Sequence, residues 1–382
     1  MNYPLQRRTV LNKALAEHEV DAFLVTAAVN VTYLTNFTGD SSFYCTAPKN
    51  GIIISDSRFE AQLKEECPGI DAHIRPHNKT TLEAAAEVLT KSAVKSCAVE
   101  ANRLSVAELE QLRAHAPKVT FVPVSGQIEG QRAVKDQGEI EHIREAVRVA
   151  ERGFRMFVNT LREADTEKDM VDALESYVRR AGARGTSFPP IVAVGERGAL
   201  PHAPPTAQQL GEGSKLLVDW GADLLYKSDI TRTLRSPFGT TPSRRNKRER
   251  VGFDFEQLYA LVKTAQEAAL AAIRPGAKAK DVDAAARKVF AGAKFQKHAG
   301  VNFADFFTHG LGHGIGLEIH EAPRIRANSD DVLQAGMVVT IEPGLYIPDW
   351  GGVRIEDDVL VTPDGAKLLT SLPREPSTLA YS

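Results

Sequence analysis

Five side chains in the second half of this 382-residue chain have the types and local contexts of metal ligands. They are Asp219, Asp229, His313, Glu342 and Glu356. One imidazole and four carboxylates form an oxygen-rich, fairly hard ligand set, which suits Mn²⁺, Co²⁺, Zn²⁺ or Fe²⁺ in a bridged pair. Four carboxylates packed together would repel one another and raise one another's pKa unless cations lay among them. The set therefore predicts a site for two divalent metal ions.

The four acids lie in segments that have the pattern of two β-hairpins. The expected strands of these hairpins are residues 216–219 with 228–234, and residues 338–341 with 353–362. A glycine-containing turn separates the first two strands, and Pro343 with Gly344 breaks the second pair. Because alternate side chains of a strand share a face, one acid from each arm can converge on a single point. Taken singly, Asp219 or Glu356 would be an ordinary acid at a strand end, so the joint pattern carries the prediction.

A faint internal repeat also runs through this half of the chain. The helical pattern of residues 143–180 recurs at residues 255–291, at an offset that pairs Asp169 with Asp281. Each copy predicts a long amphipathic helix, a short break and a second helix, followed by a segment with histidines and an acidic hairpin. Such a duplication would bring the two hairpins together about a pseudo-twofold axis, with the metal pair at that axis. Chance similarity of two helical pairs is the alternative interpretation.

From about residue 140 to its end, the chain resembles the pita-bread metallopeptidases, the family of methionine aminopeptidase, aminopeptidase P and prolidase. The motifs that carry this resemblance are residues 216–234, 309–323, 338–348 and 351–362. The resemblance implies that Asp219 holds one metal ion and that Asp229 and Glu356 bridge both ions. It also implies that His313, with Glu342, completes the coordination of the second ion.

The same resemblance implies roles for residues that hold no metal. His202 and His320 are similar to two family histidines that contact the scissile carbonyl and the intermediate. His309 resembles a further pocket histidine of the proline-specific members, and Arg354 resembles an arginine that buttresses the site. We expect Glu342 to accept the proton of the attacking water.

One departure from the family pattern concerns the interval between Asp219 and Asp229, which is one residue shorter than usual. If the deletion lies in the turn at residues 222–227, both strands keep their facing and the site survives. If it lies within a strand, Asp229 points away from the site, because side chains alternate along a strand.

The first third of the chain predicts a smaller α/β domain. The expected helices and strands are residues 5–18, 81–93 and 105–115, and residues 22–26 and 51–55, respectively. Thr80 or Thr81 is expected to cap the second helix, with Glu83 in its first turn. Residues 30–39 and 55–62 resemble the amino-terminal domain of creatinase, aminopeptidase P and prolidase. Methionine aminopeptidases generally lack that domain, so its presence favours the proline-specific branch.

A chain of 382 residues is long for one core and comfortable for two domains. Residues 124–138 contain three glycines and little apolar periodicity, which predicts a linker. We therefore expect a creatinase-like α/β domain at residues 1–130 and an α+β pita-bread catalytic domain with an internal pseudo-twofold repeat at residues 131–382.

Composition and cysteine placement predict a cytoplasmic protein without a nucleic-acid or membrane partner. With 47 basic and 49 acidic residues the net charge is -2, which gives no reason to expect nucleic acid or a membrane as partner. Cys45, Cys67 and Cys97 lie far apart, which fits a reducing compartment and speaks against a structural zinc. The basic run at residues 244–250 is expected to be a solvated loop, with a patch for an acidic partner as the alternative. We expect a homodimer.

These observations predict a dinuclear metallopeptidase that removes the residue before proline from peptides with proline in second position. Such a bond has no N–H, so enzymes that grip the N–H cannot use it. A dipeptidase must also bind the free carboxylate after proline, and Arg324 and Arg326 are the arginines available between His320 and Glu342. A creatinase-like C–N hydrolase and a catalytically silent binding protein on the same fold are the alternatives. Both would be expected to have lost metal carboxylates.

Overall fold

The protein is described by a computed structural model that covers residues 3–47, 50–236, 238 and 252–375. Contacts divide the chain into two compact units, Met1–Arg132 and Ala133–Ser382. The basic run at residues 244–250 lies outside the described residues. Among the helices of the described part of the chain, none is long and apolar enough to cross a membrane.

The division between the units falls inside the segment that was expected to be a linker, but this segment is not a bare linker. Helix α6 (Gln127–Ala133) occupies its centre. Ile128 and Arg132 are 1% and 2% exposed, and Arg132 Nη1 donates to Asn30 Oδ1 at 2.8 Å. Helix α6 is therefore packed against the rest of the first unit although it has few apolar residues. The glycines at 126 and 130 weaken the helical pattern, which explains why the sequence did not predict this helix.

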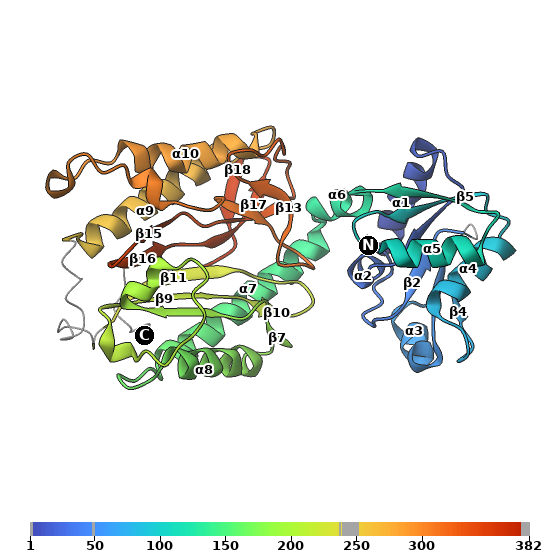
Figure 1. Ribbon diagram of the computed structural model, residues 1–382, viewed down its shortest axis with the longest axis horizontal. Coiled ribbons are helices and arrows are strands. Elements are labelled where there is room, and N and C mark those ends of the chain that lie inside the picture. Colours follow the sequence, from blue (N-terminus) through green and yellow to red (C-terminus); the bar gives the residue numbers. More distant parts are fainter. Residues whose placement is uncertain (1–2, 48–49, 237, 239–251, 376–382) are drawn as a thin grey trace. The chain divides into compact units, whose positions relative to one another are not determined.

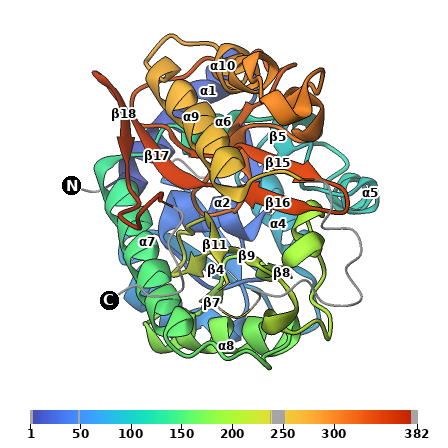
Figure 2. The same cartoon turned by 90° about the vertical axis from the view of Figure 1, so that its left-hand side faces the viewer.

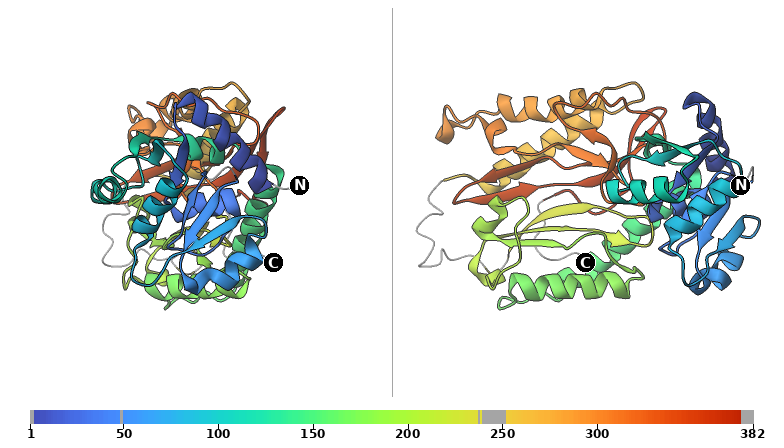
Figure 3. Two further views of the ribbon diagram at one scale, coloured as in Figure 1. Left: turned by 90° about the vertical axis from the view of Figure 1, so that its right-hand side faces the viewer. Right: turned by 45° about the vertical axis from the view of Figure 1, so that its right-hand side comes forward.

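The first unit is built on a mixed six-stranded sheet in the order β4-β3-β2-β1-β5-β6. Figure 3 shows this unit in blue and teal, with helices next to its strands. Its strands are β1 (Ala22–Val25), β2 (Phe43–Cys45), β3 (Ile52–Ser55), β4 (Asp71–Ile74), β5 (Ser96–Glu100) and β6 (Thr120–Val124). Strands β1, β5 and β6 run parallel, whereas β2 is antiparallel to both β1 and β3. The expected α/β class of this unit is confirmed.

Helices surround this sheet. They are α1 (Tyr3–Glu17), α2 (Ala28–Thr35), α3 (Glu60–Glu66), α4 (Thr81–Lys91) and α5 (Val106–His115). Helices α4 and α5 pack on the face of the sheet that carries Leu24 and Val99. Thr80 caps α4 in a capping box with Glu83, so Thr80 and not Thr81 is the cap. The three cysteines of this unit are buried and unpaired.

The second unit has a pair of helices on each side of its strands, as Figures 1 and 2 show. The pairs are α7 (Gln137–Val158) with α8 (Glu167–Arg180), and α9 (Phe255–Ala272) with α10 (Ala279–Gly292). Asp169 and Asp281 each occupy the third position of the second helix in its pair. Asp169 completes a capping box with Thr166, whereas Lys278 before α10 has no side-chain cap. The predicted repeat of two helix pairs is thus present in the fold.

The strands between these helices form several sheets, with orders β11-β9-β8, β13-β12-β14-β17-β18, β15-β16 and β10-β7. In the first half of the unit they are β7 (Gly185–Thr186), β8 (Ile191–Val194), β9 (Lys215–Trp220), β10 (Ala222–Asp223) and β11 (Ile230–Arg235). In the second half they are β12 (Gly312–Gly314), β13 (Glu321–Ile325), β14 (Val338–Ile341), β15 (Gly344–Ile347), β16 (Gly351–Arg354), β17 (Asp357–Thr362) and β18 (Gly365–Leu368). Helices on both faces of the strands confirm the α+β layout.

The single strand that the sequence predicted at residues 353–362 is wrong, because the chain forms two strands there. Strand β16 pairs with β15, and β17 pairs with β14. Between them the Glu356 N–H leaves its own hairpin and donates to the Thr231 carbonyl oxygen of the other hairpin, at 3.1 Å. The opposite arm breaks at Glu342, whose N–H donates to the Leu311 carbonyl oxygen. Both acids therefore lie where their hairpin opens, and the two hairpins are joined there.

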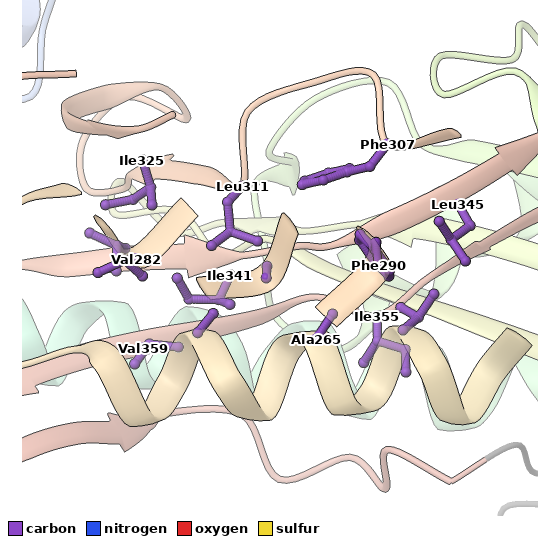
Figure 4. Close-up of a cluster of buried hydrophobic side chains, with 14 of the residues drawn as sticks. Ala265, Val282, Phe290, Phe307, Leu311, Ile325, Ile341, Leu345, Ile355 and Val359 are labelled. Carbon is purple, nitrogen blue, oxygen red and sulfur yellow. The ribbon is translucent and has the colours of Figure 1, made fainter. Parts of the chain in front are cut away.

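The apolar core of this half fills the space between α9, α10 and the strands (Figure 4). Ile341 and Ile355 flank the two metal-ligand candidates Glu342 and Glu356 in sequence, and both are fully buried. Each buried side chain of this size contributes about 1.5–3 kcal/mol relative to an exposed one. Burial of Ile341 and Ile355 therefore holds the strand ends in place and leaves the neighbouring acids to point the other way.

Candidate metal centre and substrate pocket

Strand β9 and the start of β11 position Asp219 and Asp229. Thr231 is the register partner of Asp219, and Asp229 lies just before β11 begins. The connecting turn is closed by a hydrogen bond from the Ala222 N–H to Ser228 Oγ, at 3.0 Å. Asp219 and Asp229 both line the same pocket, so the short interval between them does not point Asp229 away from the site.

His313 lies at the centre of the acidic group, on strand β12. Its Nε2 lies 3.6 Å from an oxygen of Asp229 and 3.5 Å from an oxygen of Glu342. Thr340 fixes this region, because its hydroxyl accepts the His313 N–H at 3.1 Å and donates to Glu342 Oε1 at 3.3 Å. The ring of His320 lies edge-on to that of His313, with centroids 4.4 Å apart.

Asp229, His313 and Glu356 form a group of possible metal ligands, with one donor atom from each within 4.8 Å of the others. All three residues are buried. The Thr231 hydroxyl orients Glu356 by donating to its Oε2 at 2.6 Å. One imidazole and two carboxylates at this spacing suit a hard or borderline divalent cation.

Arg354 contacts Asp219, the candidate ligand that lies outside the group of Asp229, His313 and Glu356 and is not paired with His313. Its Nη2 donates to Asp219 Oδ2 at 2.6 Å, its Nη1 donates to the Tyr346 hydroxyl at 2.8 Å, and its Nε donates to Thr231 Oγ1 at 3.0 Å. The guanidinium is buried, which strengthens its attraction for the neighbouring acids. The expected buttress role of Arg354 thus corresponds to a specific contact with Asp219.

Charge at this site is unbalanced without a cation. Burial, and after it the neighbouring Glu356 and Asp219, raise the pKa of Asp229 well above its usual range. Burial and the neighbouring Glu342 do the same to the pKa of Glu356, and burial raises the pKa of Glu342 to about 8. Glu342 would therefore be mostly protonated at neutral pH, and the other two acids would ionise less readily than usual, unless cations neutralised the group.

Two further observations show that the residues fit divalent ions. In the described part of the chain, Asp219 Oδ1 and Asp229 Oδ1 are buried without a hydrogen-bond partner, which is costly unless another ligand binds them. Burial, and after it the nearby His320, lowers the pKa of His313 to about 3. His313 is therefore the neutral imidazole that a metal ligand must be.

The other three histidines predicted for the site, His202, His309 and His320, line the same pocket. His309 Nε2 and the Tyr346 hydroxyl lie 2.7 Å apart, and His309 Nδ1 lies 2.7 Å from the Gly310 carbonyl oxygen. His202 and His320 are solvent-exposed residues of this pocket, unlike the buried His313. Exposure to the pocket leaves their ring nitrogens accessible to a bound substrate.

The pocket has a volume of about 950 Å³. Its apolar lining residues are Phe188, Pro189, Pro190, Ile191, Pro201, Ala203, Pro204, Pro205 and Ile319. Arg324 and Arg326 also line it; they are exposed, and they lie at alternate positions along and just after β13. His313 is the register partner of Arg324, so this arginine lies beside the acidic group. All eleven residues predicted from the sequence are therefore brought to one pocket.

Several residues of the site were not predicted. Tyr346 links His309 to Arg354, and Thr231 and Thr340 hold Glu356 and the His313–Glu342 pair. A tyrosine in a buried strand carries no distinctive signal. The position of Thr231, two residues after Asp229, was a usable signal, because alternate side chains in a strand face the same way.

Comparison with known proteins identifies the family. The model of metallopeptidase family M24 matches residues 141–363, and the model of the creatinase/prolidase N-terminal domain matches residues 7–134. The chain belongs to metallopeptidase family M24. This result confirms the resemblance drawn from the sequence motifs, and the fold follows the creatinase-type N-terminal domain and pita-bread catalytic domain that it implied.

Individual members of family M24 match over nearly the whole chain. The Xaa-Pro dipeptidase of Pyrococcus furiosus is 33% identical over 377 residues, which cover 97% of this chain and 99% of that protein. The structure of an Xaa-Pro dipeptidase from Bacillus anthracis matches with a TM-score of 0.86 and 31% identity, covering 98% of this chain and 99% of that one. The X-Pro aminopeptidase of Thermotoga maritima matches with a TM-score of 0.82, 31% identity, and coverage of 94% and 97%. The chain is therefore a metallopeptidase by family.

Proposed function

We propose that this M24 peptidase hydrolyses the bond between an amino-terminal residue and proline, as a metal-dependent Xaa-Pro peptidase. The observation that carries the proposal is one pocket that holds the group of Asp229, His313 and Glu356, together with exposed His202 and His320. Its full-length relatives, two Xaa-Pro dipeptidases and an X-Pro aminopeptidase, support the same substrate class. In the alternative functions, a creatinase-like hydrolase and a silent binding protein, these carboxylates would be dispensable.

Two divalent ions would be held by the five acidic and imidazole side chains, with Asp229 and Glu356 shared between them. The further ligands would be Asp219 for one ion and His313 with Glu342 for the other. When bound, such ions supply Lewis acidity and lower the pKa of a water molecule at the site. Mn²⁺, Co²⁺, Zn²⁺ and Fe²⁺ all suit this ligand set, and Mn²⁺ is our first candidate because carboxylate oxygens dominate it.

The chain's own side chains then perform the acid–base and positioning steps. Glu342 accepts the proton of the attacking water, because it lies in the pocket 3.5 Å from His313 Nε2. His202 and His320 donate hydrogen bonds to the carbonyl oxygen as it gains negative charge. His309 is held against Tyr346, which keeps its ring in place at the edge of the pocket. The apolar lining residues, such as Phe188 and Ile191, accommodate the proline ring, and none of these contacts requires a substrate N–H.

Substrate length is proposed to depend on Arg324 and Arg326. Both are exposed and line the pocket, and a guanidinium can bind the free carboxylate of an Xaa-Pro dipeptide through two hydrogen bonds. Neither side chain is buried, so both are accessible to a substrate carboxylate. A dipeptidase would use one of them as a carboxylate clamp, whereas an aminopeptidase would leave room for a longer chain.

The direct test of this function is a panel of Xaa-Pro dipeptides, Xaa-Pro-Xaa tripeptides and matched Xaa-Ala peptides, each with Mn²⁺, Co²⁺ or Zn²⁺. We expect release of the amino-terminal residue from the proline peptides alone. Equal cleavage of Xaa-Ala peptides would show a general aminopeptidase. Hydrolysis of creatine or another C–N substrate without peptide cleavage would favour the creatinase-like alternative.

Further parts of the assignment are proposals on the same footing. We propose that residues 1–130 form the creatinase-like domain and residues 131–382 the catalytic domain, a division supported by the contacts within each unit. A homodimer is proposed, to be tested by light scattering. A cytoplasmic location is supported by three unpaired cysteines.

A further inference from the structure

The guanidinium of Arg232, in strand β11, is fully buried next to the metal centre. Its Nη1 donates to the Thr231 carbonyl oxygen at 2.9 Å and to the Glu356 carbonyl oxygen at 2.6 Å. Its Nη2 donates to Asp357 Oδ1 at 2.7 Å. The two carbonyl groups belong to the positions at which the two hairpins meet, since the Glu356 N–H also donates to the Thr231 carbonyl oxygen. Arg232 therefore ties both hairpins together behind Glu356.

The other donors of Arg232 bind the C-terminal strap, which we define as residues 369–375. Nη2 donates to the Leu372 carbonyl oxygen at 2.9 Å, and Nε donates to the Pro373 carbonyl oxygen at 3.0 Å. The five N–H groups of the guanidinium thus have five acceptors: three in the strand segments and two in the strap. Removal of the strap would leave buried donors of Arg232 without acceptors, which is unfavourable because a buried N–H that makes no hydrogen bond loses its hydration without compensation.

Several contacts that do not involve Arg232 also hold the strap. The buried carboxylate of Glu151, on helix α7, accepts the Leu372 N–H at 3.0 Å and both the N–H and the hydroxyl of Ser371. The Leu369 N–H donates to the Asp358 carbonyl oxygen at 2.9 Å, which joins the strap to strand β17. The strap is thus fixed to the helix layer at one end and to the ligand-bearing strands at the other.

The strap matters because the two ligand-bearing hairpins belong to separate sheets. Strands β11 and β17 lie in different sheets, and the bridge between Thr231 and Glu356 joins them. Asp229 and Glu356 must nevertheless stay within ligand distance of one another. Any contact that fixes the relative position of these strands therefore also fixes the distance between the two shared ligands.

We propose that the C-terminal strap is a positioning element of the metal centre, with Arg232 as the positioning residue that transmits its docking to Glu356. This inference rests on the proposed metal centre. Strap docking and metal binding then stabilise each other, because a contact that raises metal affinity is itself strengthened by the metal to the same extent. Outer contacts of this kind typically change metal affinity or activity by about 10- to 100-fold.

Glu151→Ala tests the proposal from a distance, because Glu151 contacts the strap but no candidate ligand. Its matched control is Glu141→Ala, an exposed acid of the same helix that pairs with Arg144. The measurement is Mn²⁺ affinity of the apoprotein by competition with a fluorescent chelator, followed by kcat and KM on an Xaa-Pro peptide. We expect about 10- to 100-fold weaker Mn²⁺ binding and a lower kcat with unchanged KM for Glu151→Ala. Glu141→Ala should match the unaltered protein.

A second pair of variants tests Arg232 itself. Arg232→Met should lose Mn²⁺ affinity, and Arg232→Lys should restore part of it, since lysine keeps the charge but not the five-donor geometry. Truncation after Thr370 should behave like Glu151→Ala, whereas truncation after Glu375 should not. If these variants fail to fold, hydrogen exchange of the unaltered protein supplies the reciprocal measurement: Mn²⁺ should slow exchange at the Ser371 and Leu372 amides.

The outcomes separate this inference from the proposed function. Unchanged Mn²⁺ affinity in Glu151→Ala, with only a lower melting temperature, would show that the strap is merely structural and would overturn the inference. Unchanged exchange at Ser371 and Leu372 on adding Mn²⁺ would do the same. If the unaltered protein bound no Mn²⁺, Co²⁺ or Zn²⁺, the proposed metal centre itself would fall, and the strap proposal with it.

Discussion

Asp219 has two oxygen atoms with different partners, and this difference explains how a buried acid can serve a metal site. Oδ2 accepts a 2.6 Å hydrogen bond from Arg354, whereas Oδ1 is buried without a hydrogen-bond partner in the described residues. Burial raises the pKa of Asp219, and Arg354 opposes this rise. Arg354 thus favours the ionised state of Asp219 and leaves one oxygen for a metal ion.

At the residue scale, substitutions of Glu342 and His320 should have different effects on metal binding. Glu342→Gln should reduce kcat by about 10²- to 10⁴-fold and weaken the binding of one metal ion, because it removes both a proton acceptor and a charged ligand. His320→Ala should reduce kcat by about 10²- to 10³-fold and keep both ions, because His320 is placed as a hydrogen-bond donor. Metal content and kcat of each variant check this difference, with His115→Ala as an exposed histidine control. Loss of a metal ion in His320→Ala would make our role assignment wrong.

The two pocket arginines give a second prediction at this scale. If Arg324 or Arg326 is the carboxylate clamp, its change to alanine should cost about 2 to 3 kcal/mol of kcat/KM on Xaa-Pro dipeptides. Cleavage of Xaa-Pro-Xaa tripeptides should remain nearly unchanged, because their carboxylate lies one residue further on. Equal losses on both substrates, measured side by side for the two variants, would exclude a clamp.

The ligand candidates could be predicted from the sequence because their types and spacing are distinctive, whereas their supports could not. Tyr346 lies eight positions before Arg354 in the chain, and only the pairing of β15 with β16 brings its hydroxyl to that guanidinium. The contact of Arg232 with Leu372 and Pro373 spans some 140 residues of sequence, which no local pattern reveals.

At the element scale, the turn between β9 and β11 is the tightest part of the site. A Cβ atom on Gly221 would lie 1.8 Å from the Ser228 carbonyl oxygen, a distance that real side chains do not adopt. Gly221→Ala should therefore force residues 221–228 apart and displace Asp229, at a cost of about 1–3 kcal/mol in the free energy of unfolding. Chemical denaturation and Mn²⁺ titration measure the two effects.

Gly130→Ala is the control for this turn. Nothing lies within 4 Å of a Cβ at Gly130, which is in helix α6, so alanine there should be neutral or slightly stabilising. An unchanged Mn²⁺ affinity in Gly221→Ala would show that the turn does not set the position of Asp229.

A second element-scale prediction concerns Asp56, which caps a short helical turn after β3. Hydrogen bonds from Arg58, with a contribution from Arg75, lower the pKa of Asp56 to about 2. A lowered pKa in the folded state means that the stabilisation is present above the usual value near 4 and is lost as pH falls through about 2. Asp56→Asn should therefore destabilise the protein at pH 5 to 7, and by less at pH 3. A stability difference that grew between pH 5 and pH 3 would contradict this assignment.

Element boundaries show where sequence patterns fail. β-Branched residues occur on both sides of Glu356 and no glycine or proline interrupts residues 353–362, so nothing in the composition of this run marks the break between β16 and β17. The break arises because the Glu356 N–H pairs with the other hairpin, a tertiary contact. Capping residues such as Thr80, in contrast, act locally. The start of the helix at Thr81 was predicted to the residue, whereas its end lies at Lys91, two residues before the predicted end.

At the scale of the whole molecule, the proposed ligands and the pocket residues all lie in the second unit. The first unit carries none of the proposed ligands or pocket residues, and its buried strands and capped helices give it a core of its own. The second unit gathers the site from both halves of a duplicated arrangement. The helical repeat and the motifs made this organisation predictable, whereas the assignment of strands to separate sheets depended on pairings between distant segments.

The central claim is that divalent metal ions bound by these five side chains are required for Xaa-Pro hydrolysis. The most direct measurement is metal content of the purified protein by elemental analysis, paired with Xaa-Pro hydrolysis before chelation, after chelation and after Mn²⁺ is added back. We predict two bound ions per chain, loss of activity on chelation and its recovery with Mn²⁺. Absence of bound divalent metal together with undiminished hydrolysis in chelator would contradict the account.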